Sequence, residues 1–148
     1  VDLRNPQSTR PWQHVLEPLS GYFALAISLT NHLDFHGESF NFGPQAQQNH
    51  SVLELVQQMA KHWEQVRWQT MVEPLDSPYE SRLLKLNCDK ALHYLSWHAV
   101  LGFEDTVRMT AEWYRDYYLD SNQIANTTKI QISAYTKRAK ECGLDWAQ

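Results

Sequence analysis

The chain has 148 residues, of which 43% are hydrophobic and 20% charged, and its formal net charge is −4. These values are typical of one soluble globular domain, and no apolar run approaches the ~20 residues that a transmembrane helix needs. The negative charge argues against sequence-independent binding to nucleic acids, which depends on clustered lysines and arginines. Cys88 and Cys142 stand apart, without the spacing of zinc ligands, which favours a reduced, cytoplasmic protein.

The first residues, Val-Asp-Leu-Arg-Asn-Pro, lack the basic segment and apolar run of a signal peptide. They also lack an initiator methionine. We therefore expect a chain that begins part-way through a longer protein and forms a single, partial domain over residues 1–148.

A strand and a long helix are predicted first along the chain. Residues 1–5 alternate between apolar and polar types, as a strand does. Beyond residue 15, apolar residues recur at steps of three and four, which predicts a helix with one face packed in the core. That face consists of Val15, Leu16, Leu19, Tyr22, Phe23, Ala26, Leu29 and Leu33.

The middle of the chain alternates between extended and helical patterns. Residues 39–43 alternate like a strand, and residues 45–50 are predicted to be an exposed loop. Ser51 and Glu54 have the spacing of a capping box, which predicts the start of a helix that ends near residue 64. Residues 66–71 have strand-like content, and residues 83–86 are a short strand or an extended segment.

Three helices are predicted after residue 86. A short one follows Asn87, the longest runs from Phe103 to about Leu119, and another covers about 122–142 and stops at Gly143. The predicted strands are too few and too scattered for a complete parallel sheet. The fold class predicted is therefore α+β and helix-rich.

The sequence contains no glycine-rich phosphate loop, no Gly-x-Ser-x-Gly elbow and no His-Glu-x-x-His motif. Because a dinucleotide-binding turn needs glycines for close approach of the pyrophosphate, no cofactor is expected to bind this chain. His32 and His36 lie four residues apart, but the loop at Gly37 separates them from a shared helix face. No metal site is predicted.

Polar residues at the ends of the predicted elements are the remaining candidates for a binding site. Arg10 is the leading one, because a guanidinium holds two phosphate oxygens at once. The pattern alone leaves an alternative open for each, as a surface ion pair, an aromatic residue at the edge of the core, a turn former or a solvated charge. The set comprises Arg10, Trp12, Asn41, Glu80 and Arg82.

Residues 10–22, Arg-Pro-Trp-Gln-His-Val-Leu-Glu-Pro-Leu-Ser-Gly-Tyr, resemble the corresponding segment of the CDP-glucose 4,6-dehydratases. These enzymes belong to the extended short-chain dehydrogenase/reductase group. Further similar motifs follow in order, so that the resemblance covers about 1–118 and the helix at about 122–142 is an addition. The motifs are Arg4-Asn-Pro6, Phe40-Asn-Phe-Gly-Pro44, Trp68, Leu84-Lys-Leu86, Lys90-Ala91, Leu95-x-Trp97 and Thr110-x-x-Trp-Tyr114.

The resemblance implies the C-terminal, substrate-binding domain of such an enzyme, with the Rossmann domain missing. In the full-length family that domain holds NAD and a Tyr-x-x-x-Lys catalytic pair, and this sequence contains no Tyr-x-x-x-Lys. We therefore expect the chain to be inactive alone, without catalytic residues of its own. The alternative is a free-standing, truncated module that mediates interaction or dimerisation.

The resemblance also assigns roles to the candidate residues and implies a partner, a nucleotide-diphosphate sugar like CDP-glucose. Arg10 would contact the diphosphate, Asn41 would lie near the same group, and Glu80 would accept hydrogen bonds from ribose hydroxyls. Arg82 would be a second phosphate contact or a solvated charge. The chain departs from the family pattern at residues 79–83, at Asn87 and at Ser96, which leaves substrate choice at that rim open.

Overall fold

The strands are short and pair across long stretches of sequence in the computed structural model, which describes residues 1–31, 33–71 and 83–148. Two pairs form, a parallel one between β1 and β4 and an antiparallel one between β2 and β3. The strands are β1 (Asp2–Leu3), β2 (Thr9–Arg10), β3 (His50–Ser51) and β4 (Gln69–Thr70). The predicted strands at residues 1–5 and 66–71 are thus confirmed, although each is only two residues long.

Helices make up most of the described chain, which confirms the helix-rich α+β class. They are α1 (Leu16–Asn31), α2 (Val52–His62), α3 (Asp89–Leu95), α4 (Phe103–Leu119) and α5 (Ile124–Glu141), with short 3-10 turns at Leu33–Phe35, Ser121–Gln123 and Asp145–Ala147. Both bonds of the predicted capping box form, at 2.6 Å and 3.2 Å, between Ser51 and Glu54. Gly143 follows α5 with φ of +81°, as expected of a helix-ending glycine.

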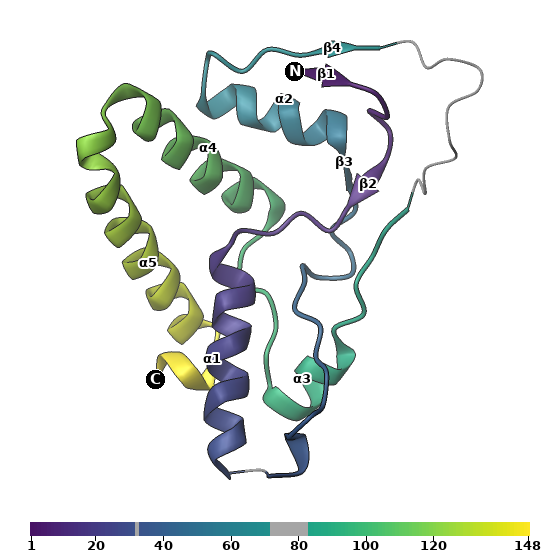
Figure 1. The fold of residues 1–148 in the computed structure, drawn as a ribbon, viewed down its shortest axis with the longest axis vertical. Coiled ribbons are helices and arrows are strands. Elements are labelled where there is room, and N and C mark those ends of the chain that lie inside the picture. The colour runs from purple at the N-terminus through teal and green to yellow at the C-terminus, as the bar shows by residue number, and fades with distance from the viewer. Residues whose placement is uncertain (32, 72–82) are drawn as a thin grey trace.

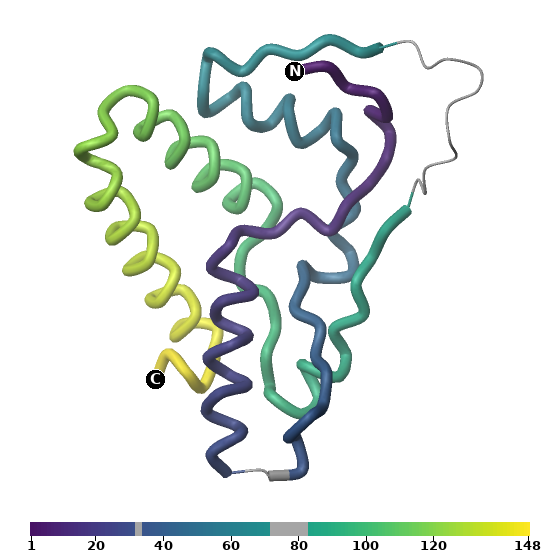
Figure 2. Tube along the Cα trace, viewed as in Figure 1, coloured from purple at the N-terminus to yellow at the C-terminus, as the bar shows by residue number. Residues whose placement is uncertain are grey.

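Figure 1 shows how the helices are arranged. The hairpin of α4 and α5 forms a V on one side of α1, while α3 and the segment before β3 lie on the other side. Helix α2 packs against α4. The tube in Figure 2 shows the segment between α3 and α4 running beside α1.

The prediction of a strand at residues 39–43 is wrong, because this segment is extended but forms no ladder. Its alternation arises from side-chain packing. The Phe42 ring packs edge-on against Trp97, with ring centroids 4.9 Å apart, and Phe40 packs against Phe35. Residues 83–86 are likewise extended without a ladder.

The prediction for the buried face of α1 is also wrong, because most of its apolar stripe stays substantially exposed. Val15, Tyr22 and Phe23 are 63%, 59% and 60% exposed, while Glu17 and Ser20 are buried. Buried hydrogen bonds account for the inward orientation of these polar residues, as described below. Gly21 permits close packing there, since a Cβ atom would lie 2.3 Å from the Phe42 ring.

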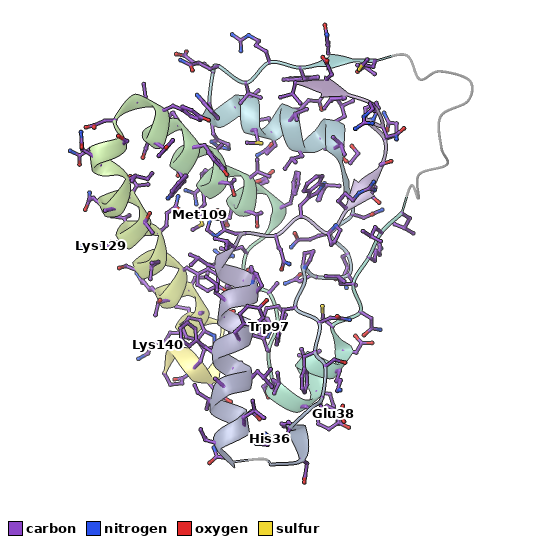
Figure 3. All side chains as sticks on the ribbon, in the orientation of Figure 1. His36, Glu38, Trp97, Met109, Lys129 and Lys140 are labelled. Carbon is purple, nitrogen blue, oxygen red and sulfur yellow. The ribbon has the colours of Figure 1, made fainter. Side chains whose placement is uncertain are left out.

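The main core lies between α1, α3, α5 and the segment after α3. Trp97, 1% exposed, lies beside α1 in Figure 3. Lys129 and Lys140 lie on the outer side of α5 in the same view and are exposed, as are Lys137 and Arg138. None of the described helices combines the length and apolarity that crossing a membrane requires.

Candidate functional site

Arg10 lies on β2, opposite His50 of β3 in the antiparallel pair. Its side chain is half-buried, and one guanidinium N–H donates to the carbonyl oxygen of Thr9 at 2.8 Å. The indole N–H of Trp12 donates to the carbonyl oxygen of His50 at 2.9 Å. The backbone around Arg10 is therefore fixed on both sides by the neighbouring strand.

The turn after Arg10 is tied to the segment that carries Asn41. The Gln13 side chain donates to the carbonyl oxygen of Phe42 at 3.1 Å, and Phe42 directly follows Asn41. Asn41 is exposed and donates to the carbonyl oxygen of Asn87 at 3.2 Å. Gln13 thus joins the segments of two of the predicted site residues, whose roles stay predictions. Glu80 and Arg82 lie outside the described residues.

Within the predicted loop at residues 45–50, β3 begins at His50. The loop also bonds to another segment of the chain. Gln45 and Gln48 donate side-chain hydrogen bonds to the carbonyl oxygens of Ala99 and Leu101, at 3.3 Å and 3.1 Å. Arg138 of α5 donates to the carbonyl oxygen between them, that of Val100, at 2.9 Å. The buried segment 99–101 therefore has its carbonyl groups satisfied by side chains rather than by a sheet.

Glu17 satisfies the donors of the same segment. One carboxylate oxygen accepts the N–H groups of Val100 and Leu101 at 2.9 Å and 2.7 Å, and the other accepts the Tyr135 hydroxyl at 2.8 Å. Ser20 accepts the indole N–H of Trp97 at 2.8 Å. These bonds tie α1 to α5 and to the segment between α3 and α4.

Burial shifts the pKa values of Glu17 and Tyr135 in this network. Removal from water raises the pKa of Glu17, although the donated hydrogen bonds and the Arg138 charge act in the opposite direction. Burial and the nearby Glu17 carboxylate both raise the pKa of Tyr135, which stays protonated and donates. Sequence reasoning did not single out Glu17 or Tyr135. For Glu17, the one available signal is an acidic residue inside an apolar helix pattern.

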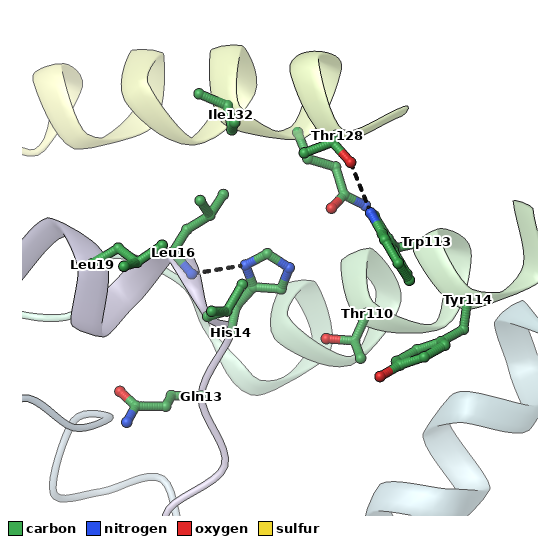
Figure 4. Close-up of a pocket in the computed structure, with 11 residues that line it drawn as sticks. Gln13, His14, Leu16, Leu19, Thr110, Trp113, Tyr114, Thr128 and Ile132 are labelled. Carbon is green, nitrogen blue, oxygen red and sulfur yellow. Dashed lines mark hydrogen bonds between the residues drawn. The ribbon is translucent and has the colours of Figure 1, made fainter. Parts of the chain in front are cut away.

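A cavity of about 510 Å³ lies where the start of α1 meets α4 and α5 (Figure 4). It is lined by Gln13, His14, Val15, Leu16, Leu19, Thr110, Trp113, Tyr114, Thr128, Gln131 and Ile132. Sequence reasoning missed this cavity, because its walls come from helices that are nearly 100 residues apart in the chain. Among the described residues, no cluster of three or more histidine, cysteine or acidic side chains could hold a metal ion.

Comparison with known proteins supports the predicted resemblance. No protein-family model matches the chain. The CDP-glucose 4,6-dehydratase of Salmonella typhimurium is 35% identical to it over 136 residues, which are 91% of this chain. The same match covers 37% of the dehydratase, so the chain spans little more than a third of that relative's length. The resemblance is thereby confirmed, and the chain is similar in sequence to one part of a CDP-glucose 4,6-dehydratase.

Proposed function

We propose that this chain is a nucleotide-sugar-binding part of a protein that resembles CDP-glucose 4,6-dehydratase, and that its ligand is a nucleotide-diphosphate sugar such as CDP-glucose. The observation that carries the proposal is the 35% identity to that enzyme over 91% of the chain. The hydrogen bond of Gln13, which joins the segment of Arg10 to that of Asn41, also supports the proposal.

Arg10 is the proposed contact to the diphosphate. Its planar guanidinium is permanently charged and can donate two parallel hydrogen bonds to neighbouring phosphate oxygens. The pairing of β2 with β3 and the Trp12 hydrogen bond hold the backbone on either side of it. A fixed backbone lowers the entropy that is lost when the ligand binds. Asn41 is proposed to donate to the same group, and Glu80 and Arg82 to complete the site.

The residues of this chain do not fit NAD, which the resemblance implies for the complete enzyme. The chain has five glycines and no glycine-rich phosphate loop, and its described strands form two isolated pairs rather than a parallel sheet. In our proposal, NAD and the Tyr-x-x-x-Lys pair belong to protein outside these 148 residues. This chain then supplies substrate binding and no catalytic residue.

Replacing Arg10 by alanine tests the proposed site. A charged hydrogen bond contributes about 1.5 to 3 kcal/mol, so Arg10→Ala should weaken CDP binding by about 10- to 150-fold. The measurement is a titration of the ¹⁵N-labelled chain with CDP, followed by amide chemical shifts.

Arg4→Ala is the matched control, because Arg4 is an exposed arginine six residues away and should leave the affinity for CDP unchanged. Cytidine, which lacks the diphosphate, should bind the wild-type chain and Arg10→Ala equally weakly. If Arg10→Ala binds CDP as the wild type does, Arg10 is not the diphosphate contact. Absence of any CDP shift at millimolar concentration would contradict nucleotide binding by the chain.

A second candidate function, an interaction module, is favoured by the outward apolar face of α1. Val15, Leu19, Tyr22, Phe23 and Ile27 are between 42% and 63% exposed and recur at helical spacing. An exposed stripe of this kind marks a surface that packs against other protein. In the isolated chain, we propose that a second copy covers it.

Sedimentation velocity at several protein concentrations tests this candidate. The chain should self-associate as its concentration rises, and Ile27→Glu should shift it towards the monomer, because a charge would have to be buried in the interface. Ile130→Glu is the control, since Ile130 is 60% exposed and belongs to α5 rather than to α1. A wild-type chain that stays monomeric throughout would rule out self-association through this face.

A further inference from the structure

The cavity between α1, α4 and α5 has the properties of a binding site for a small molecule. Its volume of about 510 Å³ falls within the range of known ligand pockets. The described residues that line it include Leu16, Leu19, Ile132 and the aromatic side chains of Trp113 and Tyr114, and none of them is an aspartate, glutamate, lysine or arginine. The lining therefore favours an uncharged, largely apolar ligand.

His14 provides a buried polar group at this cavity, since the residue is only 6% exposed. Its Nδ1 atom accepts the backbone N–H of Leu16 at 3.3 Å, at the start of α1. The proton of the neutral ring therefore lies on Nε2. Burial lowers the pKa of His14, which keeps the ring neutral.

The structure gives the Nε2–H group of His14 no acceptor among the described residues, whereas three neighbouring side chains on the lining already donate to protein acceptors. The Trp113 indole donates to Thr128, the Gln131 amide to the carbonyl oxygen of Met109, and the Thr110 hydroxyl to that of Thr106. In Figure 4, the ring nitrogen that does not bind Leu16 points towards the Trp113 side of the cavity. A donor that faces the cavity without a protein acceptor is available to an acceptor on a ligand.

We propose that this cavity binds a small, uncharged aromatic molecule that carries a hydrogen-bond acceptor, such as an aryl ketone. The acceptor takes the His14 Nε2–H, and the ring packs against Trp113 and the aliphatic side chains. The site uses neither Arg10 nor Asn41, so the inference does not depend on the nucleotide-binding role proposed above.

Titration with acetophenone tests the inference, with the His14 ring signals and the backbone amide shifts as readouts. Acetophenone should bind at millimolar concentration or below and shift the His14 signals. α-Methylstyrene has the same shape but a C=CH₂ group in place of the carbonyl. Its dissociation constant should be about threefold to tenfold higher than that of acetophenone. Benzoate, of similar size but negatively charged, should not bind. Equal affinity of the ketone and the alkene would overturn the role of His14, and no binding of acetophenone would overturn the site.

Two variants of α5 locate the site. Ile132 lines the cavity and is 46% exposed, so the larger ring of Ile132→Trp can enter the space and should abolish acetophenone binding. Ile130→Trp is the matched control, because Ile130 lies on the same helix outside the cavity lining and is 60% exposed. Acetophenone binding that survives Ile132→Trp would place the ligand elsewhere and overturn the inference. Binding of CDP should be unchanged by Ile132→Trp, which separates this outcome from failure at Arg10.

Discussion

Glu17→Ala is expected to lower the free energy of unfolding by about 3 to 5 kcal/mol, although it removes a charged residue from the protein interior. The variant leaves the N–H groups of Val100 and Leu101 buried without an acceptor and takes away the partner of the Tyr135 hydroxyl. Each unsatisfied buried group costs about 1 to 3 kcal/mol. Urea denaturation followed by circular dichroism at pH 7 measures the change.

Glu17→Gln is the control that separates hydrogen bonding from charge. The amide oxygen of glutamine can still accept both N–H groups, and its NH₂ group can donate to the Tyr135 oxygen. This variant should therefore cost about 1 kcal/mol or less. A Glu17→Ala variant within 1 kcal/mol of the wild type would show that the segment 99–101 is held mainly by packing.

Trp97→Ala should have a comparable effect, a loss of about 3 to 5 kcal/mol, because it opens a large cavity in the core. Trp97 is 1% exposed, packs against the Phe42 ring and donates its indole N–H to Ser20. The same denaturation experiment measures the change.

Trp97→Phe separates the two contributions of this side chain. The smaller ring can keep the edge-on contact with Phe42 but loses the bond to Ser20, so a cost of about 1 to 2 kcal/mol is expected. If alanine costs no more than phenylalanine, the ring of Trp97 contributes little to packing, contrary to its burial.

The helices were predictable because their signals are local. The α4 bounds of Phe103 and Leu119 follow from apolar periodicity, and α2 begins at the capping box of Ser51 and Glu54. The strand prediction at residues 39–43 failed because alternating phenylalanines occur both in a ladder and in an extended segment packed on a core. Periodicity describes one segment and carries no information about its partner.

The orientation of α1 was unpredictable for a different reason. Its apolar stripe is real, but apolar periodicity does not show whether a face packs inside the same chain or against other protein. The inward face is set by Glu17 and Ser20, whose partners lie more than 70 residues further along the chain. For the candidate site, the motif at residues 10–22 directed attention to Arg10, whereas the cavity at His14 depends on the packing of three helices.

The side-chain bonds that hold residues 99–101 have a consequence for the order of folding. They join residues separated by 38, 53, 54, 83 and 84 positions in the chain. Closing loops of that length costs entropy before any bond forms, and no local ladder can order the segment earlier. We therefore expect the segment to become ordered late, only after α1, α5 and the loop before β3 have come together. In the folded protein, the amide hydrogens of Val100 and Leu101 exchange with solvent only when this joint arrangement opens.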